Sequence, residues 1–189
     1  TTDTTADTAA AKSIVIRLTD PAGQPLEDGK VVAKIANSLN KRTTLDPIPL
    51  EDGSVRFDLP AEPGYLLVEA KAVGHVPMKA IWQVDEWDTL PKEFTFPMQL
   101  GTTISGRVQD EQGRGIENAE VQILASTSEL RNARPRTDVY RYPVKTDKDG
   151  RWICKVVPAQ LNAVWLRFVH PDYISDDMFG QTANNISID

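Results

Sequence analysis

The chain has 189 residues, of which 40% are hydrophobic, 25% charged and 7% aromatic, with a formal net charge of −6. This composition is ordinary for a folded protein and argues against wholesale disorder, and the single cysteine, Cys154, excludes an intramolecular disulfide. Residues 1–100 hold ten basic and fifteen acidic side chains and the remainder eleven and twelve, so neither half has the basic surface of a nucleic-acid-binding protein.

Residues 1–12 are nearly all threonine, alanine and aspartate. They lack the basic start and the apolar core of a signal peptide, and they offer too few large apolar side chains to fill a core. We expect a flexible linker here. A chain that opens on a linker without an initiator methionine indicates a piece of a longer protein.

From residue 13 onward the chain contains an internal repeat with a period near 90 residues. A strand-like segment turns at Asp20-Pro-Ala-Gly23, and a similar one turns at Asp110-Glu-Gln-Gly113. Two later landmarks recur in the same order, Asp52-Gly53 with Asp149-Gly150 and Gly74-His75 with Asp172-Tyr173. A period of this length fits two small β domains better than short solenoid units.

Strand periodicity dominates both halves. The clearest example is 54–59, where Val55, Phe57 and Leu59 share one face. The other predicted stripes of alternate residues are Ile14, Ile16 and Leu18; Val31, Ala33 and Ile35; Ile104, Gly106 and Val108, paired with Val121 and Ile123; Trp152, Cys154 and Val156; and Val164, Leu166 and Phe168. About seven short strands in each half predict an all-β protein, with two Greek-key β-sandwich domains of prealbumin-like or Ig-like type in tandem.

We place domain 1 at residues 13–100 and domain 2 at 101–189, with a closing strand over 94–100 before the boundary. The nearly absent linker predicts a fixed or mildly hinged pair of domains. The last strand of domain 2 is weakly marked after Tyr173. If that strand is incomplete, we expect an open sheet edge there, suited to strand addition or dimerisation. Residues 128–133 could form one helical turn.

The run from Ile104 to Val121, followed by Thr146-Asp-Lys-Asp-Gly-Arg-Trp152 and His170-Pro-Asp-Tyr173, resembles a carboxypeptidase regulatory-like domain. Gly115 stands where that family usually has proline, and residues 13–100 follow the pattern more loosely. The resemblance implies a transthyretin-like (prealbumin-like) sandwich that acts as a non-catalytic spacer, stabiliser or binding module of a secreted or cell-surface protein. It transfers no ligand signature to this chain.

Catalytic and metal-binding patterns are weak. His75 and His170 occupy similar strand-end positions in the two halves, as turn residues would, and Cys154 lies on an apolar stripe, as a buried thiol would. The segment that starts at Asp147 resembles a calcium loop but has Trp152 and Pro158 where an EF-hand needs glycine and glutamate. The acidic residues Asp85, Glu86 and Asp88 suit solvated surface charge better than a calcium site.

Two features could bind a partner. The stretch from Ser126 to Val144 is predicted to be the longest irregular segment, and it could dock an acidic partner or the acidic first half. Its charged and aromatic residues, with the flanking lysine, are Arg131, Arg134, Arg136, Arg141 and Lys145, Glu129 and Asp138, and Tyr140 and Tyr142. Among the tryptophans Trp82, Trp87, Trp152 and Trp165, we expect Trp152 and Trp165 in the core, and Trp87 is the best candidate for an exposed sugar-stacking ring.

The sequence therefore predicts a non-enzymatic module of a larger bacterial envelope or secreted protein, with no catalytic residue, cofactor or metal. Its expected partners are other domains of the same polypeptide or a separate protein, with polysaccharide as a further option, and neither nucleic acid nor direct membrane insertion is expected. The localisation, periplasmic, cell-surface or secreted, follows from the resemblance. Two alternatives stay open: an accessory carbohydrate-binding module, and a sensory or regulatory domain of a membrane-bound peptidase or transcriptional regulator.

Overall fold

The computed structural model describes residues 12–36, 42–46, 48–49, 52–60, 64–126, 136–139, 142–159, 163–173 and 179–182. We call residues 12–100 the first repeat and 101–182 the second repeat. Lys12, assigned to the linker above, instead begins the first strand, and residues 1–11 and 128–133 lie outside the described part. No helix among the described residues is long and apolar enough to cross a membrane.

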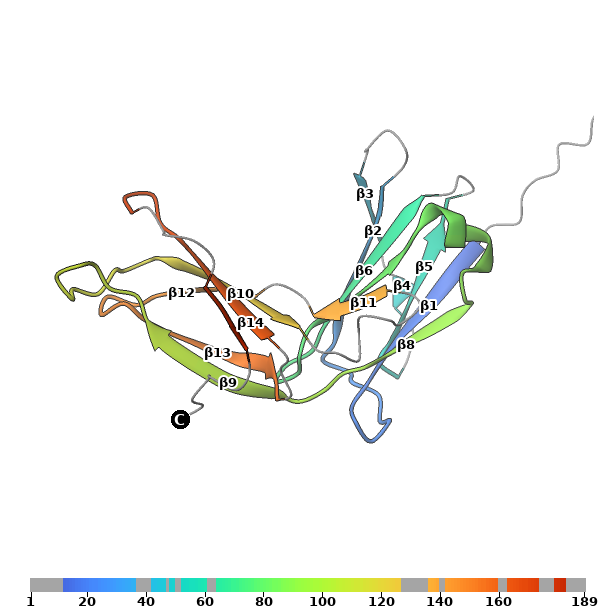
Figure 1. Cartoon of the computed structure of the whole chain (residues 1–189). Coiled ribbons are helices and arrows are strands. Elements are labelled where there is room, and N and C mark those ends of the chain that lie inside the picture. Colours follow the sequence, from blue (N-terminus) through green and yellow to red (C-terminus); the bar gives the residue numbers. More distant parts are fainter. Residues whose placement is uncertain are drawn as a thin grey trace, which may run out of the picture.

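The first repeat is a β-sandwich of two facing sheets (Figure 1). One sheet has the strand order β4-β5-β1-β8 and the other has β7-β6-β2-β3, with one further strand beside β7. The strands are β1 (Lys12–Thr19), β2 (Lys30–Ala36), β3 (Arg42–Leu45), β4 (Ile48–Pro49), β5 (Ser54–Leu59), β6 (Tyr65–Lys71), β7 (Met78–Trp82) and β8 (Glu93–Pro97). A 3-10 helix, η1 (Val84–Thr89), precedes β8 and was not predicted.

The second repeat has the same plan, with fewer strands in its described part. One sheet has the order β12-β10-β14-β15, which matches β3-β2-β6-β7, and the facing sheet pairs β13 with β9. The strands are β9 (Gly101–Arg107), β10 (Glu120–Ser126), β12 (Tyr142–Lys145), β13 (Arg151–Pro158), β14 (Ala163–Val169) and β15 (Phe179–Thr182). The weakly marked last strand thus forms, as β15 along β14.

The predicted stripes of apolar residues build two cores. Ile14 and Ile16 of β1 are 0% exposed and pack with β2, β5, β6, β7 and β8 in one cluster. In the second cluster Val121 and Ile123 of β10 pack with Trp152 and Cys154 of β13. The prediction of a β-sandwich fold is therefore confirmed. The fold follows from strands that carry apolar residues at alternate positions and bury that face against the opposite sheet.

The Asp-x-x-Gly turns do not close simple hairpins, which corrects one expectation. β1 and β2 lie in different sheets, as do β9 and β10, so the predicted pairing of the Ile104 stripe with Val121 is wrong. The two stripes instead face each other across the core, because each is apolar and must be buried against the other. The turn is held by short bonds such as the Leu26 N–H to the Leu18 carbonyl, 2.9 Å.

A strand from the second repeat completes the larger sheet of the first. β11 (Arg136–Val139) pairs antiparallel with β7, in the register Thr137 to Ala80 and Asp138 to Lys79. Figure 1 shows this orange strand against the sheet of the first repeat. The prediction of one irregular segment over 126–144 is thus wrong in part, because β11 and three of the four residues of β12 lie in it.

Candidate functional site

The residues that the sequence analysis weighed for catalysis or metal binding lie in turns or in the core. The Nδ1 atom of His75 lies 2.8 Å from the Val73 carbonyl, and Nδ1 of His170 accepts the Asp172 N–H at 3.1 Å. Cys154 is buried, and burial raises the pKa of its thiol, which disfavours the reactive thiolate. The described residues contain no group of three or more histidine, cysteine or acidic side chains that could hold a metal ion.

The residues that resembled a calcium loop form a turn. The Asp147 Oδ1 atom accepts N–H groups from Asp149 and Arg151, both at 2.9 Å, and Gly150 has φ +76°, which favours glycine. Asp20 and Asp110 accept bonds from the residues two and four positions later in the same way, at 2.8–3.0 Å. The repeated aspartate thus builds a turn, since its carboxylate takes the place of a backbone acceptor.

The acidic residues near Trp87 are also accounted for by local structure. Asp85 and Glu86 lie in the first turn of η1, where Glu86 accepts the Gln83 N–H at 2.8 Å. The Asp88 carboxylate pairs with the Lys12 ammonium at 2.7 Å, and the Asp88 side chain is 94% exposed.

The structure does not bear out Trp87 as an exposed sugar-stacking ring. Trp87 is 2% exposed and belongs to the core of the first repeat, which contradicts its assignment as an exposed ring. The sequence placed it in a polar run, but the turn of η1 directs the indole inward. Trp165 was expected in the core but is half-buried, and its register partner on β10 is Leu124, on the outward face of the sheet.

One groove lies at the free end of the second repeat, between the Asp110 turn and the His170–Tyr173 turn. Its volume is about 640 Å³. Val108, Ile116, Ala119 and Phe168 supply apolar lining, and the polar lining includes Gln109, Asp110, Arg114, His170 and Asp172. Tyr173 is 45% exposed, and its ring meets that of His170 at 5.1 Å between centroids.

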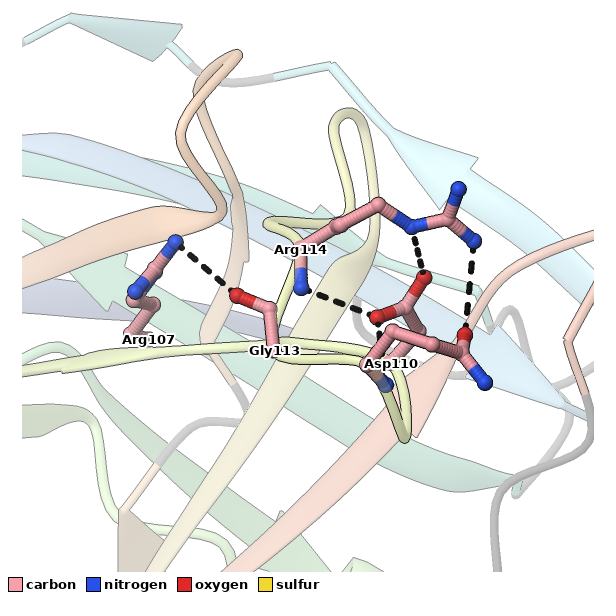
Figure 2. Close-up of polar contacts among 5 residues, drawn as sticks. Arg107, Asp110, Gly113 and Arg114 are labelled. Carbon is pink, nitrogen blue, oxygen red and sulfur yellow. Dashed lines mark hydrogen bonds and ion pairs between the residues drawn. The ribbon is translucent and has the colours of Figure 1, made fainter.

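The polar groups at this turn mostly satisfy one another (Figure 2). The Arg114 guanidinium donates from Nε to Asp110 Oδ2 at 2.8 Å, and Arg107 donates to the Gly113 carbonyl at 3.4 Å. The bond from the Arg114 backbone N–H, followed by bonds from its side chain, lowers the pKa of the Asp110 carboxyl. These bonds hold the turn that forms one wall of the groove.

The junction between the repeats is the feature that the sequence did not reveal. Val76, which belongs to the first repeat, is 3% exposed and packs in the core of the second. Its N–H donates to the Gln99 carbonyl at 2.8 Å, and the Gly101 N–H donates to the Gly74 carbonyl at 2.9 Å. A lone valine after Gly74-His75 carries no sequence signal for such a contact.

The basic segment is only partly described. The backbone of Arg136 and Asp138 lies in β11, and Lys145 at the end of β12 is exposed. The other predicted residues of that segment, Arg131, Arg134, Arg141, Glu129 and Tyr140, lie outside the described residues. What the structure does place is the docking of this segment on the first repeat, one of the two options that the sequence left open.

Comparison with known proteins gives distant similarities. No protein-family model and no curated protein matches the chain. A streptococcal ancillary pilin has 13% identity over 97% of this chain and 60% of its own length, with a TM-score of 0.32. The Bacillus anthracis TIE protein has 15% identity over 91% of this chain and 31% of its own length, with a TM-score of 0.33. The shaft pilin SpaA of Lactobacillus rhamnosus GG has 11% identity over 93% of this chain and 94% of its own length, with a TM-score of 0.34.

These scores decide neither family nor function, and the fold rests on the strand pairing described above. The resemblance to carboxypeptidase regulatory-like domains has its sandwich expectation confirmed, while the family assignment itself stays a prediction.

Proposed function

We propose that this chain is a non-catalytic spacer module that holds two β-sandwiches in a fixed relative orientation within a larger protein. The observation that carries the proposal is the two-way interlock at the junction. β11 of the second repeat extends the sheet of the first, and Val76 of the first repeat fills the core of the second.

The interlock resists bending because a hinge motion would break contacts of two kinds. It would separate the β11–β7 ladder, whose register covers four residue pairs, and it would withdraw Val76 from an apolar core. Each lost backbone hydrogen bond costs roughly 0.5–1.5 kcal/mol and each buried CH₂ about 0.8 kcal/mol. The division into two domains at Gly101 is part of this proposal, since both contacts cross it.

The resemblance supports an extracytoplasmic location and bacterial envelope or secreted proteins as the setting. The partners would then be neighbouring domains of the same polypeptide or a separate protein. Glycan binding is the alternative, and it now depends on the half-buried Trp165 instead of Trp87. Loss of polysaccharide retention in Trp165→Ala would favour that alternative, and absence of retention by the unsubstituted chain would remove it.

A distance measurement between the repeats tests the spacer role. Spin labels on cysteines introduced at the exposed positions Arg56 and Lys155 should give a narrow distance distribution. Thr137→Pro and Asp138→Pro form a matched pair. Adjacent strand residues direct their N–H groups to opposite edges, so only one of these two N–H groups donates a hydrogen bond to β7, and proline there removes it. That one variant should broaden the distribution. A broad distribution in the unsubstituted chain would contradict the proposal.

A further inference from the structure

The second repeat has no counterpart of β8 in the described part of the chain. β8 runs parallel to β1, in the register Val15 to Glu93 and Arg17 to Thr95. β9 corresponds to β1, and the described strands give it a single partner, β13, on one edge. Among the described residues, the other edge of β9 thus has unpaired backbone groups, as the edge strand of a sheet does.

The backbone register shows which groups these are. Leu18 and Val108 both donate their N–H toward the strand on the paired edge, to Gly53 and Gly150 respectively. Val15 donates the opposite way, to the Lys92 carbonyl that leads into β8, at 2.9 Å. Since N–H directions alternate along a strand, Ser105 and Arg107 direct theirs to the open edge of β9, and both residues are exposed.

The core beneath this edge is less covered than its equivalent. In the first repeat, the inward residues Ile14, Ile16 and Leu18 are at most 1% exposed. Their counterparts Ile104, Gly106 and Val108 are all only half-buried. The side chains that cover the first core from β8 and the residues after it, Phe96 and Met98, are 0% exposed.

The groove at the Asp110 turn lies where Met98 lies in the first repeat. The Met98 N–H donates to the Thr19 carbonyl at 2.8 Å, and Met98 shares a core cluster with Leu18, Leu26 and Ala70. The counterparts of those residues line the groove: Gln109 for Thr19, Val108 for Leu18, Ile116 for Leu26 and Phe168 for Ala70. The groove therefore has the position and the apolar floor to receive one bulky side chain.

From these observations we infer that the open edge of β9 and the adjoining groove form an acceptor site for an extended peptide segment of a partner protein. The segment would run parallel to β9, with bulky apolar side chains at alternate positions, as in Phe94-Thr-Phe-Pro-Met98. An acidic residue near its start would suit Arg107, because the equivalent Arg17 pairs with Glu93 of β8 at 2.6 Å.

Neither β8 nor residues 1–11 suit this role, which favours a separate partner protein over a second copy that would donate either of these segments. β8 already pairs with β1, and residues 1–11 contain no bulky apolar side chain.

A peptide with the sequence of residues 91–101, added in excess to the 189-residue chain, tests the inference. Residue-resolved amide exchange by NMR should show protection of Ser105 and Arg107 increasing at least tenfold, with β1 unchanged. The control peptide carries Phe96→Asp and Met98→Asp and should give no protection. In the protein, Ser105→Pro should abolish the effect while the exchange of β1 and β13 confirms folding.

Four outcomes would overturn the inference: no protection at millimolar peptide, equal protection by the control peptide, protection of both amides in the dilute chain alone, or protection that tracks dimerisation by sedimentation. The last would make a second copy the occupant. The test is independent of the spacer proposal, because the distance between the repeats does not enter the readout.

Discussion

The two repeats share one plan but differ in how completely they are closed. In both, an aspartate-capped turn leads from one sheet to the other, and an inward stripe of alternate residues starts the core. The first repeat seals that stripe with β8 and Met98, while the described strands of the second leave β9 with a half-buried stripe. The turn motif therefore fixes the order of the strands, and closure depends on residues outside it.

At one cross-strand pair, the second repeat exchanges the sizes of the two side chains. Trp152 on β13 stands where the first repeat has Val55, and Gly106 on β9 stands where it has Ile16. A Cβ on Gly106 would lie 2.8 Å from the Trp152 indole nitrogen, so the large ring needs the small partner. Volume is thus conserved across the strand pair, in the way that packed cores require.

The largest predicted effect comes from removing the seal of the first repeat. Phe96→Ala deletes a fully buried ring that contacts Phe94 at 5.0 Å between centroids, so we expect a loss of about 3–5 kcal/mol in the free energy of unfolding. Urea unfolding followed by tryptophan fluorescence measures it. Thr95→Ala, at an exposed neighbour, should change little; equal losses would show that β8 does not seal the core.

A second prediction concerns Gly115, which stands where carboxypeptidase regulatory-like domains, which the sequence resembles, usually have proline. A Cβ on Gly115 would lie 2.2 Å from the Asp149 backbone, so Gly115→Ala should destabilise the second repeat by about 3 kcal/mol, the upper end of overpacking. Gly113→Ala is the control, since it has φ +78° and open space around it. That substitution should cost only about 1–2 kcal/mol, and the reverse ranking in thermal unfolding would contradict the backbone contact.

A third prediction concerns a substitution that weakens the junction between the repeats. Val76→Ala removes two methyl groups from the core of the second repeat, for an expected loss of about 2 kcal/mol. The buried Cys154 thiol reports the opening of that core, so its labelling by a thiol reagent should accelerate. Val73→Ala, at a residue that is 82% exposed, should leave the labelling rate of Cys154 unchanged. A Val76→Ala variant in which that rate does not increase would contradict the interlock.

The smallest effect distinguishes the turns. Arg114 gives Asp110 a guanidinium partner, whereas Gln24 occupies that position in the first repeat. Because the pKa of Asp110 is lowered from 3.8 in the folded chain, its contribution to stability is present above that pH and is lost as the pH falls through the lowered pKa. NMR titration of the Arg114 amide should follow this loss, and Asp110→Asn should flatten it. Titration centred above 3.8 would contradict the account.

The sequence was sufficient for the turns and for the faces of the strands. Asp-x-x-Gly spacing and alternation are local signals, and they correctly placed Ile14, Phe57, Val121 and Cys154 in the cores. The pairing of strands was harder, because apolar stripes that face across a core look the same as stripes on one hairpin. That ambiguity produced the wrong pairing of the Ile104 stripe with Val121.

The junction and the groove depend on long-range geometry. Nothing local marks Arg136–Val139 as a strand for the other repeat, since four residues of mixed polarity gain their order from the edge of β7. The prediction that Trp87 is exposed was wrong for a related reason: its sequence neighbours are acidic, and only the turn of η1 carries the ring into the core. An open edge was considered from the sequence only at the last strand, where β15 pairs with β14, and not at β9.

Amide hydrogen exchange in the dilute chain tests the central claim most directly, namely that β1 is sealed on both edges and β9 on one. Val15 and Arg17, which face β8, should be strongly protected, and Ser105 and Arg107 should exchange at least a hundredfold faster, since no described strand pairs with that edge of β9. Equal protection at the two pairs of residues would show that the second repeat is closed as fully as the first, and would contradict the account.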